Sequence, residues 1–175
     1  ASDVYKRQML DIPGLPAVRT GKAEIVSVEA TPAQQAIMAD FIMRAEAIRT
    51  GRVKPEEDNM LKLTGEARLM AIDPRLIRPD ADGTGSKLSV CIEDVYQVWK
   101  DTAASASTQL VFCDVGTPKA GKFNVYDEIR NVLLAKGVPE SEIAFVHDAT
   151  SEAQRQELFE RTRQGKVRIL ILSLI

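Results

Sequence analysis

Residues 165–175, GKVRILILSLI, form the most hydrophobic stretch of the chain and decide how its fold is interpreted. Gly165 and Lys166 predict a turn. Residues 167–172 predict a buried strand, because they are mostly apolar without alternation and largely β-branched. A strand of this kind belongs in the middle of a sheet, so we expect a sheet to be built around it.

Helices and strands alternate regularly from Ser86 up to this strand. Two more strands are expected, at residues 108–115 (TQLVFCDV, interpreted as buried) and at residues 142–148 (EIAFVHD). Three helices complete the alternation. The first has Leu88, Ile92, Val95 and Trp99 on one face, and the second has Val125, Ile129, Val132 and Leu133 on one face. The third covers residues 152–164; it begins with a capping box of Ser151 and Gln154 and ends at Gly165. Such alternation indicates an α/β fold with right-handed βαβ units and a parallel sheet.

The preceding residues 10–85 are less regular and mostly helical. AEIVSVEA at residues 23–30 alternates between apolar and polar and predicts one strand. A helix then starts with Thr31 as N-cap and Pro32 in its first position, and Gly51 ends it. Residues 60–77 predict one or two short helices, stopped at Asp73-Pro74. Residues 82–87, DGTGSK, are interpreted as a flexible linker that ends in an N-cap at Ser86.

Composition and charge exclude several classes of protein. The 175 residues carry 23 basic and 25 acidic side chains, so no global field favours nucleic acid or membrane. No apolar run approaches the roughly 20 residues that span a bilayer, and the N-terminus lacks the apolar core of a signal peptide, so we expect a cytoplasmic protein. Cys91 and Cys113 lie far apart in apolar patterns and are interpreted as buried, reduced thiols.

In parallel sheets, ligands bind beyond the carboxyl ends of the strands, which directs attention to CDVGTPKAGKFN at residues 113–124. Gly116, Gly121 and Lys122 have the spacing of a phosphate-binding P-loop after a strand and before a helix. However, Phe123 stands where a P-loop needs Ser or Thr to bind magnesium, and Pro118 removes one backbone donor. The pattern therefore disfavours a nucleoside triphosphate site.

The same edge offers further polar groups. Asp114 ends the first strand, where it can act in catalysis or polarise the loop. His147 and Asp148 end the second strand, but neighbours on a strand point to opposite faces and do not form a catalytic dyad directly. The remaining donors suit phosphate oxygens, although a solvated polar rim explains them as well; they are Thr117, Lys119, Lys122, His147, Thr150 and Arg155.

The order of segments is more informative than any one residue. TQLVFCD, followed by residues 124–171 with HDATSEAQRQELFE and GKVRILI, resembles the second RecA-like lobe of superfamily 2 helicases and translocases. Residues 23–48, 59–77 and 86–100 resemble the segment that joins the two lobes in Swi/Snf-type translocases. The closest resemblance is to large helicase proteins of phages and conjugative elements, often fused to a DNA methyltransferase region, and it extends from about Leu10 to Ile171.

This resemblance implies an ATP-dependent enzyme in which two lobes hold ATP and Mg²⁺ between them. The first lobe supplies the P-loop lysine and the Mg²⁺-binding acidic pair, and the second supplies an arginine finger and contacts to the tracked strand. This chain carries neither the first lobe nor the arginine-finger helix, so no cofactor is expected for the chain alone. The resemblance makes five of the donors candidate DNA-backbone contacts: Thr117, Lys119, His147, Thr150 and Arg155.

Both ends of the chain depart from the family. Residues 1–9 fit no part of the pattern, and Leu172 to Ile175 replace the start of the family's glycine-rich coupling loop. We expect a fragment with a non-native lead-in (residues 1–9), an inter-lobe segment (10–85) and a truncated lobe (86–175). A sheet that lacks its later strands is expected to leave 167–172 open on one side and prone to aggregation.

The sequence thus favours one part of a DNA helicase or translocase that is inactive alone and whose partners are DNA and the missing first lobe. Two alternatives stay open. One is a small phosphate- or nucleotide-binding α/β enzyme that uses the Gly116–Lys122 loop. The other is a non-catalytic docking domain.

Overall fold

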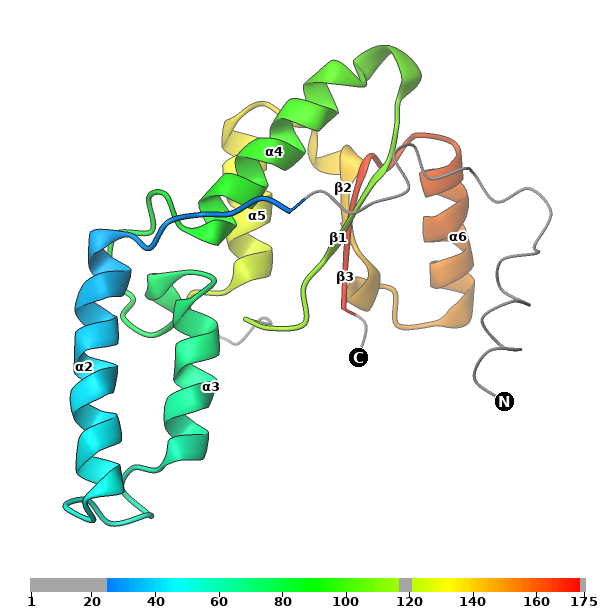
Figure 1. Ribbon diagram of the computed structural model, residues 1–175. Coiled ribbons are helices and arrows are strands. Elements are labelled where there is room, and N and C mark those ends of the chain that lie inside the picture. The colour runs from blue at the N-terminus through cyan, green and yellow to red at the C-terminus, as the bar shows by residue number, and fades with distance from the viewer. Residues whose placement is uncertain (1–24, 117–120, 174–175) are drawn as a thin grey trace, which may run out of the picture.

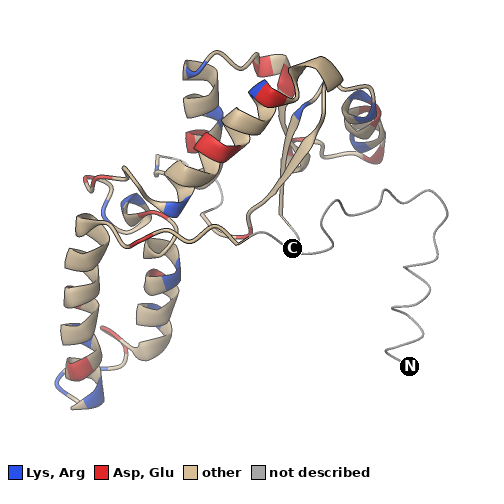
Figure 2. Cartoon of the chain, turned by 45° about the horizontal axis from the view of Figure 1, so that its top comes forward, with Lys and Arg blue, Asp and Glu red and all other residues tan. Residues whose placement is uncertain are grey.

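A computed structural model describes residues 25–116 and 121–173 of the chain. The first part of the fold is a pair of packed helices. These are α2 (Pro32–Arg49) and α3 (Met60–Met70), followed by the 3₁₀ turn η1 (Pro74–Leu76). They lie to one side of the sheet in both views (Figures 1 and 2). Their facing side chains form a small core of Ile37, Phe41, Leu63 and Met70.

The predicted start of α2 is confirmed. Thr31 Oγ1 accepts from the Gln34 amide over 3.2 Å, and the Gln34 side chain accepts from the Thr31 amide over 2.9 Å. The strand predicted for residues 23–30 is wrong for its described part. Residues 25–30 have no strand structure, and Ile25 and Val26 are 86% and 58% exposed. Alternation alone does not make a strand when no neighbour supplies backbone hydrogen bonds.

The second part of the chain alternates between helices and strands as predicted. Its elements are α4 (Lys87–Asp101), η2 (Ala103–Ser105), β1 (Gln109–Phe112), α5 (Val125–Ala135), η3 (Glu140–Glu142), β2 (Ile143–Phe145), η4 (Val146–Asp148), α6 (Glu152–Arg163) and β3 (Ile169–Leu172). All strand pairings are parallel. The fold is therefore α/β, with a small three-stranded parallel sheet flanked by helices and preceded by a mostly helical segment. This arrangement is consistent with an incomplete RecA-like fold.

The strand order is β1-β3-β2, which places the last strand at the centre. The prediction that residues 167–172 form a central strand is confirmed for Ile169–Leu172. The expectation that this strand is open on one side is wrong, because β1 and β2 pair with its two edges. The buried interpretation of β1 is also wrong: Leu110 and Phe112 are 55% and 52% exposed, since β1 lies at an edge of the sheet.

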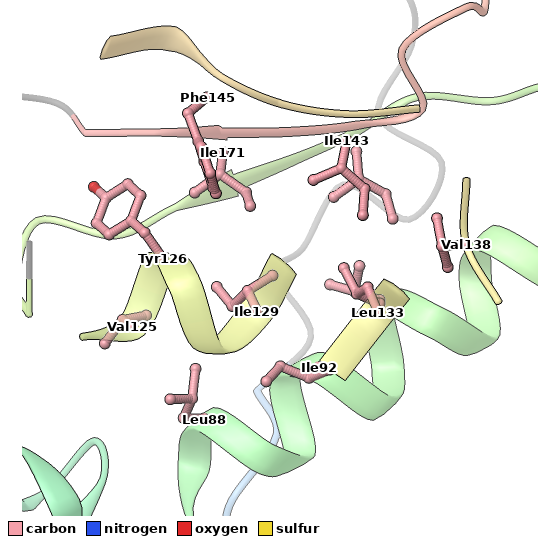
Figure 3. Close-up of a cluster of buried hydrophobic side chains, with 12 residues drawn as sticks. Leu88, Ile92, Val125, Tyr126, Ile129, Leu133, Val138, Ile143, Phe145 and Ile171 are labelled. Atoms are coloured by element: carbon pink, nitrogen blue, oxygen red, sulfur yellow. The ribbon is translucent and has the colours of Figure 1, made fainter. Parts of the chain in front are cut away.

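Helices cover the two faces of the sheet unequally. Helices α4 and α5 cover one face and α6 lies on the other (Figure 1). Side chains from α4 and α5 meet the sheet in the main core, in which Ile129 and Leu133 of α5 lie between Ile92 of α4 and Ile143 of β2 (Figure 3). On the other face, Leu158 of α6 packs with Val167 and Leu170.

Two further findings concern the cysteines and the membrane. Cys113 is partly buried and Cys91 is exposed, so the prediction of two buried thiols is wrong for Cys91; both are free. Burial raises the pKa of the Cys113 thiol, which donates to the Val115 carbonyl over 3.1 Å. In the described ranges, no helix combines the length and the hydrophobicity that a membrane span requires.

Candidate nucleic-acid interface

The carboxyl ends of all three strands lie at one edge of the sheet, because the strands are parallel. The segments that follow them are residues 113–116 after β1, η4 after β2 and Ser173 after β3. Helices α5 and α6 also begin at this edge, where Asn124 and Ser151 accept hydrogen bonds from the first-turn amides of Asp127 and Gln154. The fold thus gathers most of the predicted donors at one place.

Tyr126 connects the ends of β1 and β2. Its side chain is buried, its hydroxyl donates to the Cys113 carbonyl over 2.5 Å, and its ring centroid lies 5.1 Å from that of His147. Burial is the main reason why the pKa of the Tyr126 hydroxyl is raised, and the nearby Cys113 and Asp114 raise it further. Tyr126 was not among the site residues predicted from the sequence. The only signal for it in the sequence is its position next to Val125, on the apolar face of a predicted helix.

The ends of β1 and β3 are also joined. Ser173 Oγ donates to Asp114 Oδ1 over 2.9 Å. Asp114 therefore takes part in a contact between two strand ends. A carboxylate at this position also places negative charge at the edge, which opposes phosphate binding in its immediate vicinity.

His147 lies in the turn η4 and not on the strand β2, which ends at Phe145. Its ring stacks on the Phe145 ring, with centroids 5.4 Å apart and an interplanar angle of 15°. The premise that His147 and Asp148 point to opposite faces of a strand is wrong, because the turn brings His147 Nε2 within 3.5 Å of Asp148 Oδ1. The imidazole is 46% exposed and is therefore accessible from solvent.

Arg130 of α5 lies beside this pair and was not predicted. Its guanidinium carbon is 4.2 Å from the centroid of the Phe145 ring, and Nη2 is 3.6 Å from Asp148 Oδ2. Its Nε is buried and has no hydrogen-bond partner among the described residues. Together with residues of α6 it lines a hollow of about 280 Å³ beside β2. Arg130 thus places a positive charge beside Asp148 and the Phe145 ring.

Thr150 and Arg155 both contribute to the start of α6. The Thr150 amide lies 3.0 Å and its hydroxyl 3.1 Å from Gln154 Oε1, and the Gln154 side chain also accepts from the Ser151 amide. Arg155 Nε donates to the Ala149 carbonyl over 3.2 Å. The capping box predicted at Ser151 is confirmed. Part of the hydrogen-bonding capacity of these side chains is therefore used to hold the turn between β2 and α6.

The loop after β1 is described only at its two ends. Thr117 and Lys119 lie outside the described residues. Gly116 has φ of +65°, and its carbonyl accepts from the Val125 amide over 3.0 Å. Lys122 is exposed immediately before α5. The Phe123 ring lies 4.3 Å from the Arg75 guanidinium, so it is a packing residue and offers no ligand to Mg²⁺. The described end of the loop therefore offers no hydroxyl to Mg²⁺ at position 123.

Arg75 links the helical segment to this edge. Its guanidinium binds Asp73 and also Glu128 of α5, to which Nη1 donates over 2.7 Å. Gly83 packs directly against it, since an added Cβ would lie 2.3 Å from Arg75 Nε. The segment interpreted as a flexible linker is thus packed on Arg75, while its N-cap at Ser86, which accepts from the Ser89 amide, is confirmed.

Charges at the edge have both signs. The first turn of α5 carries Asp127 and Glu128, and that of α6 carries Glu152. Acidic and basic residues are also mixed along α6 (Figure 2). Acidic first turns use part of the favourable helix-terminus potential that an anion would otherwise meet. Over residues 25–116 and 121–173, the structure has no group of three or more His, Cys, Asp or Glu side chains placed to hold a metal ion.

Comparisons of this chain with protein-family models, with curated proteins and with solved structures found no match.

Proposed function

We propose that this chain is part of an ATP-dependent DNA helicase or translocase, in which it contributes contacts to the nucleic-acid backbone and one wall of the ATP cleft between two lobes. One observation supports this most directly. The parallel sheet and the starts of α5 and α6 bring Lys122, His147, Thr150 and Arg155 to one edge. This is the edge at which the resembling helicase lobes contact the phosphate backbone.

The chemistry of these groups suits phosphate and carries no base-specific information. Lys122 is exposed at the start of α5, and His147 has an accessible imidazole beside Arg130. Few phosphates can be neutralised by so small a set, and the acidic residues of the first helical turns oppose them. Binding is therefore expected to be weak, independent of sequence and strongly salt-dependent.

The test is fluorescence anisotropy with the full 175-residue chain and labelled single- and double-stranded DNA of two unrelated sequences, over a range of salt. Lys122→Ala should weaken binding to every DNA equally and reduce the slope of log K against log salt by about 0.7–0.9, which is the contribution of one phosphate contact. Lys54→Ala removes an exposed lysine from the turn after α2 and is the matched control, expected to change nothing. Sequence preference, or equal losses in both variants, would contradict the proposal.

The chain alone should hydrolyse no ATP, with or without DNA, because half of the phosphate-handling machinery belongs to the other lobe. DNA-stimulated turnover by the purified chain would overturn this. Nucleotide binding that disappears in Lys122→Ala would favour instead the phosphate-binding enzyme. If substitutions at this edge change neither DNA binding nor nucleotide binding, the docking domain is favoured.

A further inference from the structure

Strand β1 leaves one row of backbone groups unused by the sheet. The Gln109 amide donates to the Arg168 carbonyl over 2.8 Å, and the Cys113 amide donates to the Leu172 carbonyl over 2.9 Å. In a parallel ladder every second residue turns its N–H and C=O to the same neighbour. The backbone groups of Val111 therefore also face β3. The N–H and C=O groups of Leu110 and Phe112 point to the other side of β1, where none of the residues that the structure describes adds a further strand.

The side chains of the same two residues are exposed on one face. Leu110 pairs with Leu170 and Phe112 with Leu172, so they share the face on which α6 packs. Helix α6 covers Val167 and Leu170 near the centre of the sheet but leaves Leu110 and Phe112 about half exposed. Open backbone groups and apolar side chains thus occur together at β1.

This edge also lacks the features that usually prevent pairing. Residues 109–113, QLVFC, contain no charged residue and no proline, which are the common protections of edge strands. The opposite edge of the sheet differs. Strand β2 has only three residues and is continued at both ends by the 3₁₀ turns η3 and η4, so it offers a much shorter template.

We propose that the β1 edge pairs antiparallel with the β1 edge of a second copy of this chain, about a two-fold axis at Val111. Leu110 of each copy then faces Phe112 of the other. Both residues direct their N–H and C=O to the edge, so the two pairs form four hydrogen bonds, and the apolar side chains of each pair lie side by side on one face. The strand is therefore complementary to itself, as a two-fold interface requires.

Charges favour the same partner and register. Continuing the antiparallel pairing places Asp114 of one copy opposite Thr108 of the other. Thr108 and Leu110 line a hollow of about 530 Å³ together with Arg163, which carries the positive charge there. Asp114 of the second copy thus approaches this hollow, where Arg163 also pairs with Glu160 over 3.2 Å, and no like charges oppose each other along residues 108–114. This pairing is independent of the proposed function and has its own readout.

The test is sedimentation equilibrium of the full chain over a range of concentrations. The unaltered chain should reach twice the monomer mass. Phe112→Lys should lose the dimer because it places a charge in the apolar pair, and Leu110→Pro should lose it because it removes an outward N–H that β3 does not use. Ile42→Lys, which alters an exposed apolar residue of α2, should remain dimeric. Circular dichroism reports whether each variant keeps its fold.

A cross-link tests the register. In a chain with Cys91→Ser and Cys113→Ser, the substitution Val111→Cys places two thiols at a directly opposed, non-hydrogen-bonded pair, whose Cα separation of about 4.5 Å is within disulfide range. Mild oxidation should produce a covalent dimer, whereas Ile42→Cys in the same background should produce none. A monomeric unaltered chain, a dimer that survives both β1 substitutions, or equal cross-linking at both positions would overturn the proposal.

Discussion

Arg75 holds the carboxylate of Asp73 at two points: Nε donates to Oδ1 and Nη2 to Oδ2, each over 2.9 Å. The Asp73 side chain is fully buried, and its Oδ2 also accepts from Ser86 Oγ over 2.7 Å. Arg75 thereby binds the N-cap of η1 and, through Glu128, the first turn of α5, and Asp73 in turn binds Ser86, the N-cap of α4. The helical segment and the sheet are held together by this ion pair.

Arg75→Met should lower the free energy of unfolding by about 3 kcal/mol, because it leaves a buried carboxylate without its charge partner. Urea denaturation measures the loss. Arg49→Met removes an arginine whose ion pair with Glu46 is exposed, and it should change stability by less than about 1 kcal/mol. Similar losses in the two variants would show that Arg75 does not anchor the segments.

Gly116→Ala should destabilise the fold by about 2–3 kcal/mol, because the residue has φ of +65° and a Cβ would lie 2.6 Å from Val125 Cγ2. Gly51 has φ of +69° but no atom within 4 Å of the added Cβ, so Gly51→Ala should cost only the backbone strain of about 1 kcal/mol. Thermal unfolding of the two variants separates strain from steric overlap. Equal shifts in Tm would show that the contact with Val125 is easily relieved.

The sequence predicted best the features that depend on neighbours along the chain. Thr31, Ser86 and Ser151 were all identified as N-caps, because a cap is a contact between residues three apart. The central position of residues 167–172 followed from a strand that is apolar on both faces. Which strand lies at the edge of the sheet could not be predicted, because strand order depends on contacts between β1 and β3, which are separated by about sixty residues.

In the candidate site, too, residues placed by local sequence were predicted, whereas residues placed by long-range contacts were not. Lys122, His147, Thr150 and Arg155 could be selected as candidates because they follow predicted strands or begin predicted helices. Tyr126 and Arg130 were not found, since each lies within a helix and meets its partners only through the fold. The place of His147 in a 3₁₀ turn was missed because the three residues after Phe145 (Val146, His147 and Asp148) show no pattern that separates a strand from a turn.

Stability should fall as the pH is lowered through the acid range in a manner that depends on Asp58. A hydrogen-bonded ion pair with Arg44, 2.7 Å between Nε and Oδ2, lowers the pKa of Asp58 below its ordinary value of 3.8. A lowered folded-state pKa means that the stabilisation is complete above about pH 4 and is lost as pH falls through the folded value. Urea titrations at several pH values should show a smaller acid dependence for Asp58→Asn than for the unaltered chain. An unchanged slope would exclude the pair as its source.

Tyr126→Phe should lower the free energy of unfolding by about 1 kcal/mol, because the Cys113 carbonyl loses its hydrogen bond from the buried hydroxyl. Tyr96→Phe is the control, since the described contacts of Tyr96 with Trp99, Lys100 and Lys136 are made by its ring and should persist. The ring of residue 126 remains against His147 in the variant, so the ¹H–¹⁵N signals of His147 should move little while those of residues 113–116 shift. Large changes at His147 with none at 113–116 would mean that Tyr126 supports the turn after β2 and not the loop after β1.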